Sequence, residues 1–334
     1  MTNQKSLVLL LTLSILFSTF FNNSVNVTTE IKFVQNVYAH NFTPNNYASL
    51  VSSIDKFQIE SKLVYDNLMT GNSSLAEKHA AEAVSIFSWD LMLETEERDK
   101  KVSDEIKTAI ENLQNISSSF SSSVATNSLD PNKLEQMDRA SQLVKLIDAN
   151  TNIMINITES QQQIEDSNPL NQVVLFLTNI FTGQENSNNT SIHPMRFAEV
   201  VDSVLRNYGD AYDVKFDMTD MTNMANMDND QSLSMTNKSA DNYQNKINSI
   251  ENAASYQSAM GLAEHLLKIF DDELLPSMAA NGTSALSTNL REGILHLSSS
   301  IKDKASPEDI MMIVHTQIHP NLIKAFNLQI LSDA

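Results

Sequence analysis

The chain has 334 residues, enough for one large domain or two smaller ones. Its formal net charge is −19, which argues against the clustered basic surface that nucleic-acid binding requires. There is no cysteine, which excludes disulfides, thiolate metal sites and cysteine nucleophiles, and six glycines are too few for a turn-rich β fold.

The first 39 residues have the pattern of an export signal. Lys5 precedes a short apolar run, Leu7 to Phe21, which is below the roughly 20 residues that span a bilayer. Val37 and Ala39 then fit the small-residue rule for signal-peptidase cleavage. We expect cleavage after Ala39, which makes His40 the first mature residue and the protein extracellular or bound to the cell surface. An uncleaved membrane anchor is the alternative.

Acceptor sequences for N-glycosylation are consistent with export. An Asn- and Ser-rich chain also produces such triplets by chance, so unmodified surface residues are the alternative. The triplets after residue 39 begin at Asn41, Asn72, Asn115, Asn156, Asn188, Asn189, Asn237 and Asn281.

Four amphipathic helices are predicted in the first part of the mature chain. Apolar residues recur at helical spacing over 48–69, 74–93, 103–120 and 130–149. Ser73 or Ser74 is expected to cap the second of these helices, and Pro131 suits the first turn of the fourth.

The second part of the chain repeats this plan at an offset of about 180 residues. "LAEKHAAEAVSIF" parallels "SAMGLAEHLLKIF", "DEIKTAIENLQNISSS" parallels "TNLREGILHLSSSIKD", and "LDPNKLEQM" parallels "ASPEDIMMI". We therefore expect an all-α protein made of duplicated four-helix-bundle-like repeats behind the signal peptide. The repeats are assigned to 40–150 and 192–334, with a polar connector, 151–191, that contains one apolar helix.

Several of these segments resemble a family of secreted helical proteins from ammonia-oxidising archaea. The similarity lies in "YAH" near the predicted cleavage point, in "RNYGDAY", in a Met-rich loop and in "ASPEDIMMIVHTQIHPNLIKAFNL" near the C-terminus. The resemblance implies export and a helical fold, and it implies no activity.

The segment 217–235 is rich in methionine, and its first part, 217–228, has no other large apolar residue that would mark a core helix. A strict three-residue step also spirals around a helix of 3.6 residues per turn instead of forming a stripe. Thioethers are soft ligands that suit Cu(I), so the segment is a candidate copper site in a mobile loop; a polar linker with incidental methionines is the alternative. The candidate ligands are Met218, Met221, Met224, Met227 and Met235.

Three histidines are further metal candidates. His315 and His319 are four residues apart on a predicted helix that Ser306 caps and Pro307 begins. Histidines that only pack against neighbouring helices would show the same spacing, and the glutamate of a zinc-protease HExxH motif is missing. His40 would offer a chelating amino group and ring if cleavage occurs after Ala39. We expect the remaining histidines to be packing or capping residues.

These patterns predict a metal-binding protein, with Cu(I) binding or buffering through the methionine-rich loop as the first hypothesis. Its partner would be the metal ion, and a cell-surface protein is a further candidate. The competing hypothesis is a glycosylated extracellular scaffold without a metal role. No enzyme is expected, because no nucleophile with its base, paired carboxylates or phosphate loop stands out.

Overall fold

The computed structural model describes residues 47–122, 131–167, 192–214, 250–280 and 282–328. Every regular element in these ranges is helical, which confirms the all-α class. The signal segment, His40 and the methionine-rich loop 217–235 lie outside the described residues. None of the described helices is long and apolar enough to span a membrane.

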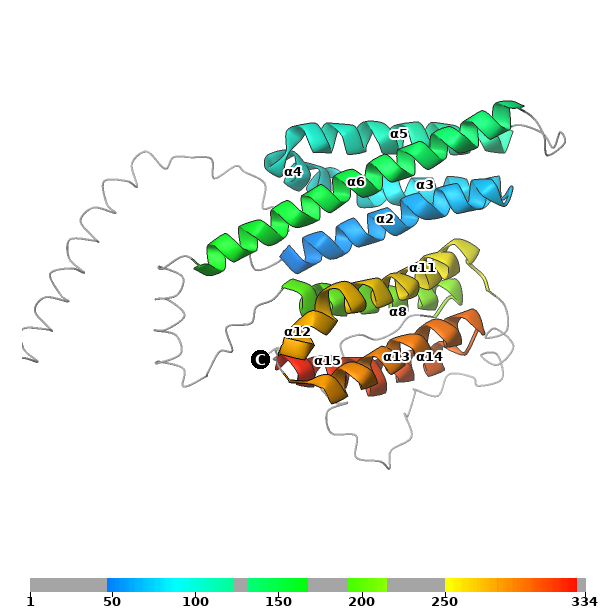
Figure 1. Ribbon diagram of the computed structural model, residues 1–334. Coiled ribbons are helices and arrows are strands. Elements are labelled where there is room, and N and C mark those ends of the chain that lie inside the picture. The colour runs from blue at the N-terminus through cyan, green and yellow to red at the C-terminus, as the bar shows by residue number, and fades with distance from the viewer. Residues whose placement is uncertain (1–46, 123–130, 168–191, 215–249, 281, 329–334) are drawn as a thin grey trace, which may run out of the picture. The chain divides into compact units, whose positions relative to one another are not determined.

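The helices of the first half pack around one core (Figure 1). Phe57 of α2 lies at its centre, fully buried, with its ring centroid 5.2 Å from that of Phe87. α2 packs against α3 and α6, and α5 packs against both α3 and α6. The helices are α2 (Tyr47–Met69), α3 (Ser73–Ile86), α4 (Trp89–Arg98), α5 (Lys100–Ser122) and α6 (Pro131–Ser167).

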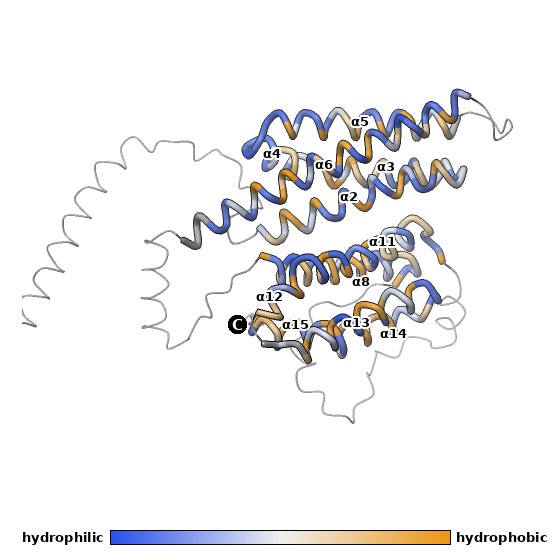
Figure 2. Tube along the Cα trace, viewed as in Figure 1, coloured by the Kyte–Doolittle hydropathy of each residue, from blue (hydrophilic) through white to orange (hydrophobic). Residues whose placement is uncertain are grey.

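The helices of the second half enclose another core, in which Phe197, Tyr208 and Phe270 are fully buried. α8 and α11 pack closely, and α13 packs on α11. The helices are α8 (Ile192–Ala211), α11 (Ala253–Ile269), α12 (Leu275–Ala280), α13 (Ser284–Lys302), α14 (Pro307–Ile313) and α15 (His319–Phe326), with π-helical segments η3 (Phe270–Leu274) and η4 (Val314–Ile318). Figure 2 shows apolar and polar residues interspersed along these helices, as amphipathic packing requires.

Several predicted boundaries differ from the structure. The predicted helix 74–93 is divided into α3 and α4, where Phe87 leaves the helix and its side chain enters the core. Asn72, not Ser73 or Ser74, caps α3, because its side-chain oxygen accepts a hydrogen bond from the Leu75 N–H. α6 continues past residue 150 into the predicted connector, because Met154 and other residues beyond that point bury an apolar face.

The two π-helical segments have the same sequence context. Each ends two residues before a proline, Pro276 after η3 and Pro320 after η4. Proline has no N–H and its ring crowds the carbonyl four residues earlier, so a regular α-helical hydrogen bond cannot form there. The N–H groups of Leu275 and His319 instead bind carbonyls five residues back. The helices widen at these points, and π segments of this kind are frequent at functional sites.

α2 and α8 connect the two cores. Ile59 and Leu63 of α2 belong to the core of the second half, while Ile192 of α8 belongs to that of the first half. α2 also packs against α11. Polar side chains occur between these buried apolar residues, and they form the candidate site.

Candidate metal centre

A guanidinium–carboxylate pair lies at the centre of the polar cluster. Arg196 of α8 donates from Nε and Nη2 to the two carboxylate oxygens of Asp55 on α2, both at 2.7 Å. His265 of α11 lies 2.9 Å from the same carboxylate through Nε2. Burial alone would raise the pKa of Asp55, but hydrogen bonds from Arg196 and His265 outweigh it and lower that pKa. Asp55 is therefore a buried anion held by two cationic or polar partners.

The cluster continues toward the surface through Glu273, which η3 contributes. Arg196 Nη1 donates to Glu273 Oε1 at 2.6 Å, and His193 Nδ1 lies 2.7 Å from Glu273 Oε2. Glu159 of α6 approaches from another helix, with Oε1 3.7 Å from His193 Nδ1. Burial, with the negative charge of Glu273 in support, raises the pKa of Glu159.

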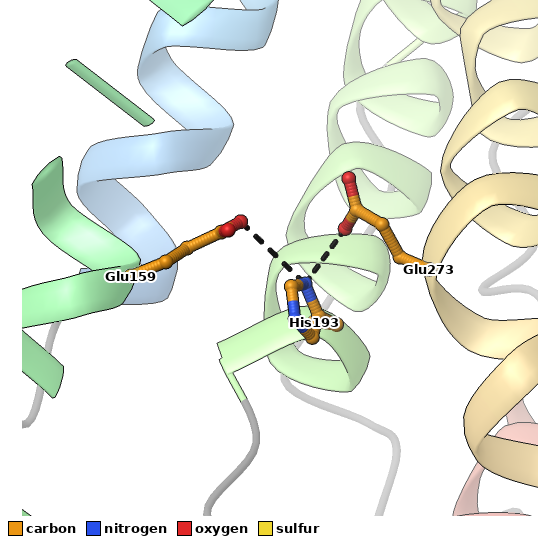
Figure 3. Close-up of side chains that lie close together, drawn as sticks. All are labelled: Glu159, His193 and Glu273. Atoms are coloured by element: carbon orange, nitrogen blue, oxygen red, sulfur yellow. Dashed lines mark hydrogen bonds and ion pairs between the residues drawn. The ribbon is translucent and has the colours of Figure 1, made fainter. Parts of the chain in front are cut away.

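Glu159, His193 and Glu273 together form a group that could hold a metal ion. One ligand atom from each residue lies within 4.8 Å of the other two. Figure 3 shows the two carboxylates pointing at the His193 ring from different helices. Each side chain is between one fifth and one third exposed, so an ion could reach the group from solvent.

The charge of the cluster favours a cation. Glu159, Glu273 and Asp55 supply three negative charges against the single positive charge of Arg196 when both histidines are neutral. A divalent ion would balance the remainder. Carboxylate and imidazole ligands suit borderline and hard dications such as Zn²⁺, Fe²⁺ or Mn²⁺, whereas Cu(I) prefers sulfur.

Without a metal, the ligand atoms of His193 and Glu273 lie closer together than they would around a bound ion. Two ligands of a tetrahedral ion with bonds of about 2.05 Å lie about 3.3 Å apart. The 2.7 Å separation between His193 and Glu273 is instead a hydrogen bond, in which Nδ1 carries the proton. Metal binding therefore requires the ring to move that proton to Nε2 and the two side chains to separate slightly.

A second buried network involves a histidine that we predicted to have a packing role. His79 of α3 is 1% exposed and lies 2.7 Å from Glu60 through Nδ1 and 2.8 Å from Gln257 through Nε2. Gln257 in turn accepts a hydrogen bond from Asn67. Every ring nitrogen of His79 is satisfied within the protein, so this network ties α2, α3 and α11 together and leaves no ligand position open.

Glu60 also borders a cavity of about 320 Å³. Lys56 and Glu82 line it as well, with burial lowering the pKa of Lys56 and raising that of Glu82. Both shifts favour the neutral forms of these side chains at this polar surface.

Two of the residues predicted as metal ligands lie in the described part of the chain. His315 is in η4 and His319 begins α15, with ring centroids 5.3 Å apart and the rings edge to face. As predicted, Ser306 caps the preceding helix by accepting from the Asp309 N–H, and Pro307 begins it. The five methionines Met218, Met221, Met224, Met227 and Met235, and His40, lie outside the described residues.

The sequence reasoning missed the ligand group Glu159–His193–Glu273 and its partners. A usable signal was present for two of the residues: Asp55 and Arg196 interrupt the apolar faces of α2 and α8, and a charge at such a position requires a buried partner. Glu159 and Glu273 occur among other polar residues and carry no comparable signal.

Comparisons with protein-family models, with curated proteins and with solved structures found no match.

Proposed function

We propose that this chain is a metal-binding protein that holds a divalent cation such as Zn²⁺, Fe²⁺ or Mn²⁺ at Glu159, His193 and Glu273. The observation that carries the proposal is the convergence of these three ligand atoms, from α6, α8 and η3, within 4.8 Å. The excess negative charge around Arg196 supports it. The role is binding, and no catalytic step is assigned to the site.

The test is a competition titration of metal-free full-length protein against a chromophoric chelator, with Zn²⁺ and Mn²⁺ at pH 7. Glu273→Gln retains the shape of the side chain and can still accept from Arg196, but it removes a charged ligand. We expect Glu273→Gln and His193→Gln each to weaken binding at least tenfold. The matched controls are Glu264→Gln, which alters an exposed ion pair with Lys302, and His296→Gln, which alters an exposed histidine. Equal affinity in all four variants would refute the proposal.

The methionine-rich loop is proposed as a separate Cu(I) site, because thioethers match Cu(I) and the Glu159–His193–Glu273 group does not. Export and glycosylation remain proposals that rest on the sequence pattern of residues 1–39 and on the Asn-X-Ser/Thr triplets. An extracellular scaffold without a metal role is the competing function, and failure of both metal titrations would favour it.

We also propose that the two halves are related by pseudo-symmetry. The order of their helices along the chain supports this. α2 corresponds to α8, α3 to α11 and α4 to η3 with α12. α5 then corresponds to α13, and α6 to the stretch from α14 to α15. The reciprocal placement of Ile59 and Ile192 in each other's core adds further support. Superposition of the two halves in an experimental structure tests the relationship.

A further inference from the structure

The turn between α2 and α3 contains one of the N-glycosylation triplets, Asn72-Ser73-Ser74. Asn72 and Ser74 are exposed, and Ser73 is partly exposed. The triplet follows Gly71, whose positive φ of 75° belongs to the turn that ends α2. Asn72 has non-helical backbone angles, φ −91° and ψ 71°, so the triplet begins outside a regular helix and at the protein surface.

The hydrogen bonds of Asn72 leave its side-chain nitrogen available. Its Oδ1 accepts from the Leu75 N–H at 3.3 Å and caps α3, and its backbone N–H donates to the Asn67 carbonyl at 2.8 Å. Among the described residues, no hydrogen-bond partner is found for Asn72 Nδ2 or for the Ser74 hydroxyl. N-glycosylation attaches the sugar to Nδ2 and retains the oxygen, so modification does not remove the helix cap.

The other two triplets within the described residues lie inside helices, Asn115–Ser117 in α5 and Asn156–Thr158 in α6. Both asparagines are exposed, but Ser117 and Thr158 are 0% exposed. Each hydroxyl donates to a carbonyl of its own helix, at 2.8 and 2.9 Å respectively. Residues two apart point to nearly opposite sides of an α-helix, about 200° apart, so an enzyme cannot reach the amide and the hydroxyl together. Modification there requires part of a packed helix to unfold.

The triplet at Asn72 needs much less rearrangement. The N–H groups of Ser73 and Ser74 belong to the first turn of α3, where the helix itself offers them no partner. Straightening the triplet breaks the side-chain cap at Leu75 and the bond from the Ala76 N–H to the Asn72 carbonyl, 3.0 Å long. Helix ends open locally at a far lower free-energy cost than packed helix interiors.

We propose that, of these three triplets, Asn72 is the one that carries an N-glycan in the folded protein. The sugar donor is an oligosaccharide linked to a lipid phosphate. The anomeric carbon bonds to Nδ2 as its bond to the phosphate oxygen breaks, the lipid phosphate leaves, and Nδ2 releases a proton to a base of the transferring enzyme. The inference rests on the export proposed above, which brings the chain to such an enzyme, and it does not depend on metal binding.

Glycosylation of folded full-length protein in vitro tests the acceptor without requiring export. The protein is incubated with a purified single-subunit oligosaccharyltransferase and its lipid-linked donor, and glycopeptides are mapped by mass spectrometry. We expect occupancy at Asn72 to exceed that at Asn115 and at Asn156 at least tenfold. Synthetic peptides that contain the three triplets should be modified at similar rates, because the fold no longer distinguishes them.

Two serine variants provide a matched pair. Ser74→Ala removes the hydroxyl that the triplet requires but retains the Asn72 cap, so it should abolish modification at Asn72. Ser73→Ala changes the middle position, which accepts any residue except proline, and should leave the modification unchanged. Both variants should unfold within a few degrees of wild type, which shows that the loss in Ser74→Ala does not come from misfolding.

An unmodified Asn72 in the folded protein would overturn the inference, and so would equal occupancy at Asn72, Asn115 and Asn156. Equal modification of wild type and Ser74→Ala would also overturn it. Fractionation of the native cells tests export separately. Protein found only in the cytoplasm refutes export and leaves the in vitro result for the acceptor unaffected.

Discussion

Replacement of Arg196 by methionine tests the role of the buried ion pair in stability. The change removes three charge-assisted hydrogen bonds, two to Asp55 and one to Glu273, at 2.6 to 2.7 Å. Methionine fills most of the volume but leaves Asp55, whose side chain is fully buried, with His265 as its remaining partner. Breaking a buried pair from one side costs about 3–5 kcal/mol, and we expect about 4 kcal/mol for Arg196→Met.

A double-mutant cycle isolates the pair itself. Asp55→Asn leaves Arg196 bound to Glu273, so we expect it to cost about 3 kcal/mol, and the double variant should cost about the same as Arg196→Met alone. The coupling would then be about 3 kcal/mol. Urea unfolding of metal-free protein at pH 7, followed by far-UV circular dichroism, measures each variant.

The matched control is an ion pair of similar length at the surface. Lys62 and Asp66 are 2.5 Å apart on α2 but both are largely exposed. Lys62→Met should cost about 0.5 kcal/mol or less, because solvent screens exposed pairs. A loss below about 1 kcal/mol for Arg196→Met, or a coupling near zero, would refute the view that buried electrostatics links α2 to α8.

Three further predictions concern other parts of the chain. A methyl group on Gly293 would lie 3.2 Å from the side chains of Gln317 and Ile318 and 3.3 Å from the Gln317 carbonyl. Gly293→Ala should therefore push α13 away from η4 and lower the free energy of unfolding by about 1–3 kcal/mol, measured by thermal unfolding. In metal-free protein, the lowered pKa of His319 removes stability as pH falls from 6.5 toward 4, whereas the raised pKa of Asp202 removes it as pH rises from 3.8 toward 6. The two effects oppose each other in wild type. Asp202→Asn should therefore lose about 2 kcal/mol more stability than wild type between pH 7 and pH 4 in urea titrations, and parallel pH profiles would contradict this. In the methionine-rich loop, Met218, Met221, Met224 and Met227 are replaced together by leucine. This variant should lose Cu(I) binding in a chelator competition, while its unfolding temperature stays within a few degrees of wild type. Unchanged Cu(I) affinity would identify the loop as a linker.

Helical periodicity predicts the helices of this fold because it depends only on local sequence. The apolar positions Leu50, Ile54 and Phe57 do line the buried face of α2, and Pro307 does begin α14. The Glu159–His193–Glu273 group could not be predicted in this way, since Glu159 and Glu273 lie 114 positions apart in the chain and meet only through tertiary packing. Prolines at 276 and 320 are visible in the sequence, but the π segments before them depend on which carbonyls remain available after packing.

The placement of Ile59 and Leu63 in the core of the second half affects how the chain folds during synthesis. α2 leaves the ribosome long before α8 and α11, so these two side chains and the carboxylate of Asp55 have no native surroundings until more than half of the protein has been made. The first half alone would expose the apolar side chains of Ile59 and Leu63, and Asp55 would lack its partners Arg196 and His265. We therefore expect a truncated product that ends before α8 to be a substrate for chaperones and proteases instead of a stable domain.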